Sequence, residues 1–388
     1  MNILVVGNGF DIAHNLPTSY KAFLYFTDVF LDFINYRQIG KFPEAKDDDD
    51  PRLFDYLTQL FKSSDNKDSA LIDELASLIS KNLWLEHFKK VQIEDGWVDF
   101  EREISQVIQA LDEVRRVVKN EVQTSGKLTK LTPYQYEKLQ LLLDNKTLIG
   151  GLEPINTYKD KLLQDLNRLT RCLEIYLYSF VESLSVAQKI PCITKLNIDC
   201  VLSFNYTHTF KIAYGNTTDK LINYDFVHGQ AKKDSNIENC NMIIGIDEYL
   251  SGEDRDCDNE FVYFKKFFQR IYKGTGSKYR EWLSLATPCP TQNLNPKASN
   301  VYIYGHSLDA TDKDILQALL LSDNTTVTIF YHTKEALAKQ IENLIKVIGE
   351  EELIHRTGGT NQTISFVSID VANSWKKSDL LDPVESML

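Results

Sequence analysis

The sequence predicts an α/β protein built on one mostly parallel sheet, with a large helical insertion. An apolar run, Asn2–Val6, leads directly into the glycine turn Gly7-Asn8-Gly9, which is typical of the start of a β–α unit. Helical periodicity then dominates from about residue 71 to residue 184. After Pro191 the pattern changes to short, near-continuous apolar runs, which are typical of strands covered on both faces of a parallel sheet.

The composition of the 388 residues supports a folded core and narrows the class of protein. Hydrophobic residues make up 43% of the chain, and the formal net charge is −12. Because an acidic chain repels a polyphosphate backbone, nucleic acid is an unlikely partner. No apolar run reaches 18 residues and no basic leader precedes the first strand, so we expect a cytoplasmic protein without a membrane partner. The six cysteines include no C-x-x-C pair, and we expect reduced thiols.

The predicted elements follow in order along the chain. A helix is expected from Tyr20 to about Asn35, and an exposed loop at the acidic run 46–51. In the helical block, apolar residues recur every three or four positions, as at Phe100, Ile104, Val107, Ile108 and Leu111. Strands are expected at 200–204, 222–227, 242–246, 301–304, 327–331 and 364–369, with helices at 312–321 and 334–348. These elements predict a discontinuous α/β nucleotide-binding domain at 1–40 and 191–388, and a helical insertion at 41–190.

The segment 261–270 mixes aromatic and basic residues. Stacking on single-stranded bases is one interpretation of this pattern. Helical spacing places Phe261, Phe264, Phe268 and Ile271 on one face, so we favour a helix that buries this face and exposes its basic side.

The turn Gly7-Asn8-Gly9-Phe10-Asp11 suits a nucleotide phosphate. Two glycines after a buried strand let the backbone bend sharply and bring its N–H groups against a pyrophosphate. The third glycine of the G-x-G-x-x-G fingerprint is missing, and an ordinary turn is the alternative. Asp11 is placed either to bind a ribose hydroxyl or to cap the following helix, and Tyr20 offers a ring and a hydroxyl to a ligand.

Three further polar clusters follow predicted strands, at the edge of the sheet where ligands collect in α/β proteins. They are Ser203-Phe204-Asn205-Tyr206-Thr207-His208, His228-Gly229, and Tyr304-Gly305-His306-Ser307 with Asp309 and Asp312 beyond it. Each alone is open to ordinary turn chemistry, but four such strand ends favour a site. Histidine transfers protons near neutral pH, and an amide holds a water or a ribose hydroxyl. Such a set is suited to breaking a glycosidic bond to a good leaving group, such as nicotinamide on ribose.

A two-metal phosphoesterase is a rival interpretation, with Asp11, His14, Asn205, His228 and His306 as ligands. A two-metal site of this kind requires an Asp-x-His pair after the first strand, whereas Asp11 and His14 lie three residues apart. We therefore expect a site without a metal.

The same motifs, together with Leu16-Pro17-Thr18-Ser19-Tyr20 and Trp97-Val98-Asp99-Phe100-Glu101, resemble those of the AbiH family of bacterial abortive-infection proteins. The resemblance spans residues from about 1 to 320. The glycine turn and Tyr304-Gly305-His306-Ser307-Leu308 are its most specific parts. It implies an antiphage role, with a phage-derived trigger and a second copy of the chain as candidate partners.

The AbiH family in turn is similar to the sirtuin-like, Rossmann-like NAD-binding fold. This similarity implies that Asn205 positions a water or the ribose, that His228 accepts a proton, and that Gly7, Gly9 and Ser307 contact the dinucleotide. Two departures are the absence of a C-x-x-C zinc module and Thr207, which stands where an acidic residue often follows the asparagine turn. Further candidates for binding the nucleotide, from the same motifs, are Asn8, Phe10, Asp11, Tyr20, Tyr206, Gly229, Gly305 and His306.

The expected activity is that of an NAD glycohydrolase, a hydrolase that takes NAD as its substrate and depletes it after infection. The alternative is a module that senses NAD or ADP-ribose and acts through a partner, because asparagine and histidine serve binding and chemistry equally well.

Overall fold

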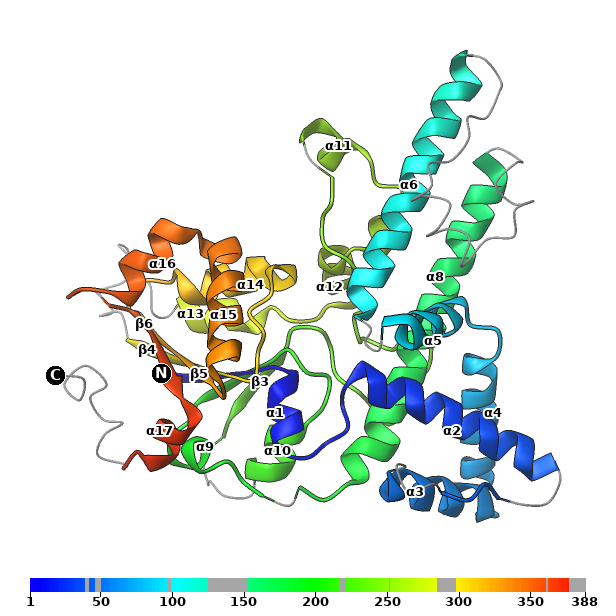
Figure 1. Cartoon of the computed structure of the whole chain (residues 1–388), viewed down its shortest axis with the longest axis horizontal. Coiled ribbons are helices and arrows are strands. Elements are labelled where there is room, and N and C mark those ends of the chain that lie inside the picture. The colour runs from blue at the N-terminus through cyan, green and yellow to red at the C-terminus, as the bar shows by residue number, and fades with distance from the viewer. Residues whose placement is uncertain are drawn as a thin grey trace. The chain divides into compact units, whose positions relative to one another are not determined.

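The computed structural model describes residues 1–38, 42–45, 50–95, 99–124, 152–186, 188–215, 221–250, 252–284, 298–360 and 362–376 (Figure 1). They form two compact units. The first comprises residues 1–18, 184–230 and 274–388, and the second comprises residues 19–183 and 231–273. The predicted domain boundaries at residues 40 and 190 stay a prediction. Trp97, Val98, Cys289 and most of the acidic run 46–51 lie outside the described residues.

The first unit is built on a six-stranded, all-parallel sheet with the order β3-β2-β1-β4-β5-β6. Its strands are β1 (Asn2–Val6), β2 (Cys200–Ser203), β3 (Asn223–Phe226), β4 (Ser299–Tyr304), β5 (Thr325–Tyr331) and β6 (Ile364–Ser368). The central strand β1 pairs Val6 with Ser203 of β2 on one side and with Tyr304 of β4 on the other. The expected parallel sheet is therefore confirmed, and the chain extends it first on one side of β1 and then on the other.

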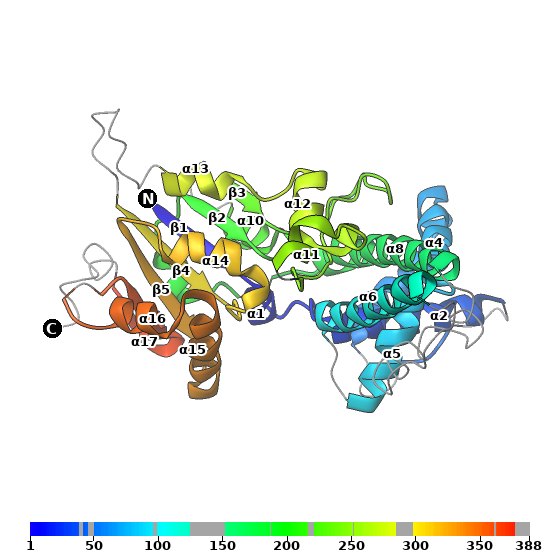
Figure 2. The same cartoon turned by 90° about the horizontal axis from the view of Figure 1, so that it is seen from above.

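Helices cover both faces of this sheet (Figures 1 and 2). Alternate residues of a strand point to opposite faces, so Ile3 and Val5 pack in one apolar cluster, and Leu4 and Val6 in another. The first cluster includes residues of α13 (Lys278–Ser284), α14 (Lys313–Leu320), α15 (Lys334–Ile348) and α16 (Glu350–Thr357). The second includes residues of α1 (Asn8–Ala13), α9 (Pro191–Lys195), α10 (Thr209–Tyr214) and α17 (Ile369–Ser374). Burial on both faces explains the continuous apolar runs in the sequence.

The second unit is helical. It contains α2 (Tyr20–Gln38), α3 (Pro51–Lys62), α4 (Asn66–Ile79), α5 (Leu83–Asp95), α6 (Phe100–Thr124), α8 (Leu152–Ile175), α11 (Gly252–Cys257) and α12 (Lys266–Lys273). The periodic residues of α6, from Phe100 to Leu111, face inward as expected.

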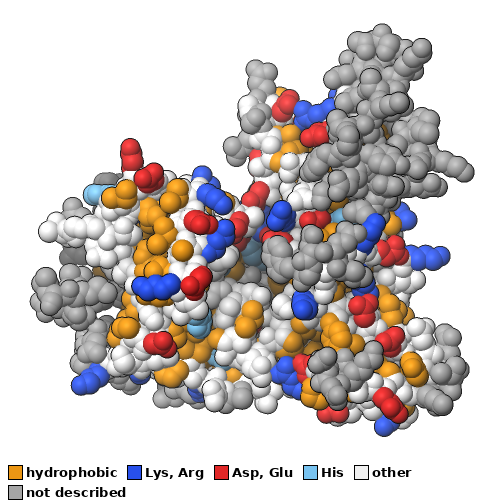
Figure 3. Space-filling model, in the orientation of Figure 1, with side chains coloured by type: hydrophobic (Ala, Val, Ile, Leu, Met, Phe, Trp, Pro, Cys, Tyr) orange, Lys and Arg blue, Asp and Glu red, His pale blue; other side chains and the backbone are white. Residues whose placement is uncertain are grey.

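No helix in the described part of the chain is long and apolar enough to cross a membrane. On the face drawn in Figure 3, the described Lys and Arg side chains are scattered among Asp and Glu side chains.

The strand predicted at 242–246 is wrong. This segment lies in the helical unit and makes a single bridge, from Ile246 to Lys265. The carbonyl of Met242 instead accepts from the Lys273 ammonium (2.6 Å), and that of Ile244 accepts from the Gln269 amide (3.0 Å). Side-chain donors satisfy the buried backbone here in place of a neighbouring strand, and an apolar run cannot distinguish the two.

The orientation predicted for the segment 261–270 is partly wrong. Phe261 and Phe264 are buried as expected, but Ile271 is 78% exposed, whereas Lys266 and Gln269 are buried. Lys266 forms an ion pair with Glu101 (2.7 Å). Polar groups that find partners can be buried at little cost, so the polar side of α12 packs inward.

His14 links the short helix α1 to α10. Its Nδ1 lies 2.7 Å from the Phe10 carbonyl oxygen, and its Nε2 lies 2.9 Å from the Tyr214 hydroxyl. The Phe10 carbonyl can only accept, so Nδ1 carries a proton and donates it to this oxygen. In the neutral ring Nε2 then accepts the proton of the Tyr214 hydroxyl, which itself accepts the N–H of Ile190 (2.8 Å). Burial lowers the pKa of His14, which agrees with this neutral state.

We expect His14 to make stability depend on pH. Since the pKa of a free histidine is 6.5 and that of folded His14 is lower, the unfolded chain binds more protons below that pH. The free energy of unfolding should therefore fall as the pH drops below 6.5. His14→Gln cannot titrate and should flatten this dependence by up to about 1.4 kcal/mol per pH unit. Urea denaturation at several pH values tests this, and parallel curves for both proteins would contradict it.

Candidate functional site

Polar turns follow four neighbouring strands of the sheet. β3, β2, β1 and β4 lie side by side and run parallel, so the turns that contain His228, Asn205, Gly7 and His306 share one edge. The chain changes direction across the sheet between β1 and β4. In open α/β sheets a crevice forms at such a point, outside the carboxyl ends of the strands.

Three glycines hold the turns after β1 and β4 in direct backbone contact. The Gly9 N–H donates to the Gly305 carbonyl (2.8 Å), and the Gly7 N–H donates to the Tyr304 carbonyl (3.2 Å). A Cβ on Gly7 would lie 2.7 Å from the Gly305 oxygen. A Cβ on Gly305, where φ is +68°, would lie 2.2 Å from the Phe10 nitrogen. These glycines are therefore required by packing, and a pyrophosphate here would have to be held by groups other than the N–H of Gly7 and Gly9.

Asn205 reaches from the end of β2 to this glycine turn. Its Nδ2 donates to the Gly7 carbonyl (2.8 Å), and the Ser203 hydroxyl fixes its backbone by donating to its carbonyl (2.9 Å) and accepting its N–H (3.1 Å). Because the amide nitrogen points to Gly7, the side-chain oxygen is the part of the amide that is suited to accept a hydrogen bond from a water or a ribose hydroxyl.

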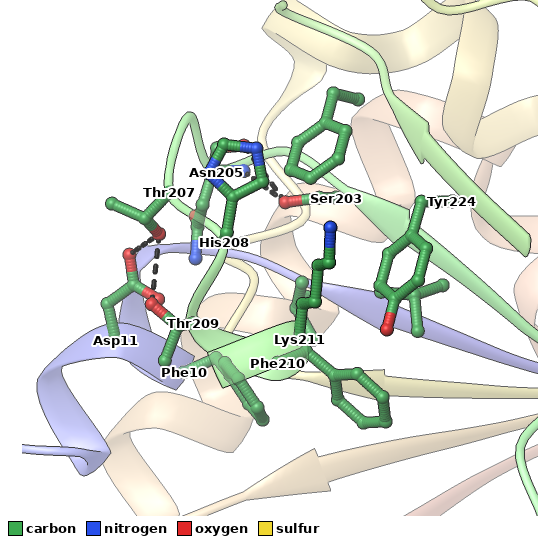
Figure 4. A pocket seen from close by; sticks show the side chains of 13 residues that line it. Phe10, Asp11, Ser203, Asn205, Thr207, His208, Thr209, Phe210, Lys211 and Tyr224 are labelled. Atoms are coloured by element: carbon green, nitrogen blue, oxygen red, sulfur yellow. Dashed lines mark hydrogen bonds between the residues drawn. The ribbon is translucent and has the colours of Figure 1, made fainter. Parts of the chain in front are cut away.

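Asp11 and Thr207 join α1 to the turn after β2 (Figure 4). The Thr207 hydroxyl donates to the Asp11 carboxylate (2.6 Å) and accepts from the Thr209 hydroxyl (3.0 Å). A carboxylate thus does lie at the asparagine turn, but it comes from Asp11. Beside it is a small pocket lined in part by Asn205 and Lys211, with room for about one water molecule.

Two histidines from different strand ends approach one carboxylate. His228 Nε2 lies 3.0 Å from Asp312 Oδ1, and His306 Nε2 lies 3.7 Å from Asp312 Oδ2. All three residues are buried. The Phe204 ring is edge-on to both imidazoles, with centroids 5.6 Å from His228 and 4.1 Å from His306. The structure therefore assembles a histidine–aspartate–histidine cluster at the ends of β3 and β4.

The Nδ1 atom of His228 is the most informative atom of this cluster. It is buried and has no hydrogen-bond partner among the described residues. His306 differs, because its Nδ1 accepts the N–H of Leu308 (2.9 Å). A buried polar atom without a partner costs about 1–3 kcal/mol. A ligand hydroxyl that donates to His228 Nδ1 would remove this cost, which makes the atom a candidate for ligand binding.

The turn that carries His306 is held in a strained conformation. Leu308 has a φ of +59° and is fully buried. A side chain at positive φ costs about 1–2 kcal/mol. The core around Leu308 and a hydrogen bond from Asn343 to the Ser307 carbonyl (2.9 Å) maintain it. Strain of this kind is common where a functional side chain must be positioned accurately.

The remaining predicted contacts are placed as follows. Gly229 has a φ of +79°, Ser307 is exposed and Tyr206 is half-buried. Asn8 accepts a hydrogen bond from the Thr18 hydroxyl (2.6 Å). Phe10 is fully buried in the apolar cluster with Leu4 and Val6.

Tyr20 belongs to the helical unit rather than to the sheet unit. Its ring stacks on Phe100, with centroids 4.0 Å apart. The role predicted for Tyr20 in binding a nucleotide stays a prediction.

One ligand of the two-metal interpretation, His14, makes hydrogen bonds within the fold that would have to break before it could bind a metal. Both ring nitrogens of His14 make hydrogen bonds within the fold. In the described ranges, no three His, Cys, Asp or Glu side chains are arranged to hold a metal ion.

Sequence reasoning missed the contact between Asp312 and the histidines. The available signal was an aspartate six residues after His306, at the start of a predicted helix. The sequence placed Asp309 and Asp312 beyond the Tyr304–Ser307 cluster, but it did not predict that the Asp312 carboxylate contacts the two histidines.

Comparison with known proteins identifies the family. A family model described as "Bacteriophage abortive infection AbiH" matches residues 3–332. Neither the curated proteins nor the solved structures contain a match.

Gly305→Ala should destabilise the protein by about 3 kcal/mol or more, because it adds a backbone clash to the strain of positive φ. Gly359→Ala is the matched control, since φ there is +76° and no atom lies within 4 Å of an added Cβ. The control should cost about 1–2 kcal/mol. Urea denaturation of both variants measures the difference, and equal losses would contradict the packing role of Gly305.

Proposed function

This chain belongs to the AbiH family of bacteriophage abortive-infection proteins, and we propose that it acts in phage defence as an NAD glycohydrolase. In this proposal it depletes the NAD of an infected cell by hydrolysing the bond between nicotinamide and ribose. A phage-derived trigger and self-association are proposed to control it. The observation that carries the proposal is the Nδ1 of His228 at the carboxyl edge of the sheet, which is buried and has no hydrogen-bond partner within the described ranges.

The strand order supports a dinucleotide as the ligand. Numbered along the chain, the order is 3-2-1-4-5-6, as in doubly wound sheets that bind dinucleotides where the order reverses. In such sheets the pyrophosphate lies near the first β–α turn. In this chain the N–H groups of Gly7 and Gly9 donate to the turn after β4, so we propose that side chains around the turn hold the pyrophosphate. The Rossmann-like and sirtuin-like character of the fold is part of this proposal.

The proposed reaction uses two side chains. The Asn205 oxygen accepts a hydrogen bond from the attacking water or from a ribose hydroxyl. His228 Nδ1 accepts the proton as the water oxygen bonds to the anomeric carbon of the ribose. The bond from this carbon to the pyridinium nitrogen breaks, and its electron pair leaves with nicotinamide, which departs neutral. The products are nicotinamide, ADP-ribose and a proton.

A nucleotide-sensing module that acts through a partner is the second candidate. The burial of the His228 and His306 side chains, 7% and 5% exposed, favours it. A buried imidazole can hydrogen-bond a nucleotide and so sense its binding without catalysing its hydrolysis.

His228→Gln should lower nicotinamide release by at least about 100-fold, because it removes the general base. His355→Gln, on the exposed surface of α16, should keep the wild-type rate. Chromatography of nicotinamide measures the rate, with concentrated protein and with phage-infected lysate as triggers. The enzyme proposal fails if the wild type releases no nicotinamide under any of these conditions, and the role of His228 fails if His228→Gln is fully active.

Asn205→Ala should weaken the binding of ADP-ribose by about tenfold, through the loss of one hydrogen bond. The Gly7 carbonyl keeps its bond from the Phe10 N–H (2.8 Å), so the turn should persist. Calorimetry measures the affinity, and thermal melting confirms the fold. Binding without turnover over hours would favour the sensor. Unchanged binding by the variant would exclude Asn205 from the site.

A further inference from the structure

Asp309 and Asp312 lie just before α14, and their carboxylates have different partners. Asp309 is an ordinary cap, since its carboxylate accepts the N–H of Thr311 (3.1 Å) at the start of the 3₁₀ turn Ala310–Asp312. Asp312 occupies the cap position of α14 but makes no side-chain cap hydrogen bond. Its carboxylate lies instead at the imidazoles of His228 and His306.

This placement has a cost that capping would avoid. A buried carboxylate is unfavourable unless donors surround it. The proton of neutral His306 is on Nε2, because Nδ1 accepts the Leu308 N–H, so His306 presents an N–H toward Asp312. His228 also presents Nε2, 3.0 Å from Asp312 Oδ1, in an ion-pair contact whose geometry is not that of a hydrogen bond. The negative charge of the carboxylate favours a proton on that nitrogen.

The tautomer of His228 follows from this contact. A neutral imidazole carries one proton, so a proton on Nε2 leaves the lone pair on Nδ1. Nδ1 is buried, and no residue in the described part of the chain donates a hydrogen bond to it. Nε2 therefore faces Asp312 and carries the proton, and Nδ1 is the nitrogen that can accept a proton from a ligand.

We propose that Asp312 is a positioning residue that holds His228 and His306 together and fixes His228 in the Nε2–H tautomer, with Nδ1 as its base nitrogen. Its effect on catalysis rests on the proposed NAD hydrolysis, whereas the tautomer is a property of the protein alone.

Nitrogen NMR of the full chain with ¹⁵N-labelled histidine tests the tautomer directly. The chain has seven histidines, and His228→Gln assigns the signals of His228 by difference. At about pH 8, where a free histidine with a pKa of about 6.5 is neutral, the wild type should show an unprotonated Nδ1 and a protonated Nε2 for His228. A proton on Nδ1, alone or together with one on Nε2, overturns the proposal.

Two variants complete the test. Asp312→Asn should move both His228 signals toward the values of exchanging tautomers, and Asp309→Asn, the matched control, should leave them unchanged. Unchanged His228 signals in a folded Asp312→Asn protein overturn the proposal. If Asp312→Asn does not fold, the wild-type tautomer still decides the matter.

The kinetic measurement separates this proposal from the proposed function. Asp312→Asn should lower kcat for nicotinamide release by at least about 100-fold with KM nearly unchanged, while Asp309→Asn keeps the wild-type kcat. Wild-type kcat in Asp312→Asn overturns the positioning role. If the wild type releases no nicotinamide, NAD hydrolysis fails, and the NMR result alone decides the role of Asp312.

Discussion

The close backbone contact between the turns after β1 and β4 is the constraint on which the rest of the site depends. Gly7 and Gly9 meet Gly305 at distances that exclude a Cβ on any of the three. The contact places His306, the next residue of the chain, beside the glycine turn, and the Gly7 carbonyl receives the amide of Asn205. Three strand ends are thus joined by one turn. The glycines shape the site, and recognition of a ligand falls to the side chains around them.

Much of the fold could be predicted because burial on two faces leaves a clear trace in sequence. Five of the six runs predicted as strands after Pro191 are strands of the parallel sheet, and the predicted helix at 334–348 is α15 (Lys334–Ile348). The predicted strand at 242–246 and part of the predicted orientation of α12 were wrong because hydrogen bonds and ion pairs of polar side chains determine the structure there. The run 242–246 is as apolar as a strand, yet Lys273 and Gln269 satisfy its carbonyls. In α12 a paired lysine is buried while Ile271 is exposed. Apolar periodicity contains no information about such partners.

The site shows the same division. Residues at the ends of strands could be located from sequence, since the carboxyl ends of parallel strands share one edge. Their partners could not. The Asp11 carboxylate reaches Thr207 across 196 positions of the chain, and Asp312 approaches a histidine from each of two strand ends. The absence of side chains at Gly7 and Gly9 was predicted to make room for a phosphate. In the structure it makes room for the backbone of Gly305. Family membership connects the chain to abortive infection, while the chemistry proposed for it depends on a single imidazole nitrogen.

An experimental structure with ADP-ribose or NAD bound would test that dependence most directly. We expect a nucleotide across the carboxyl edge between β1 and β4, with a ribose hydroxyl or a bound water about 3 Å from His228 Nδ1. A nucleotide bound elsewhere, with Nδ1 still lacking a partner, would contradict the proposed site. The same holds if neither ADP-ribose nor NAD binds at saturating concentration.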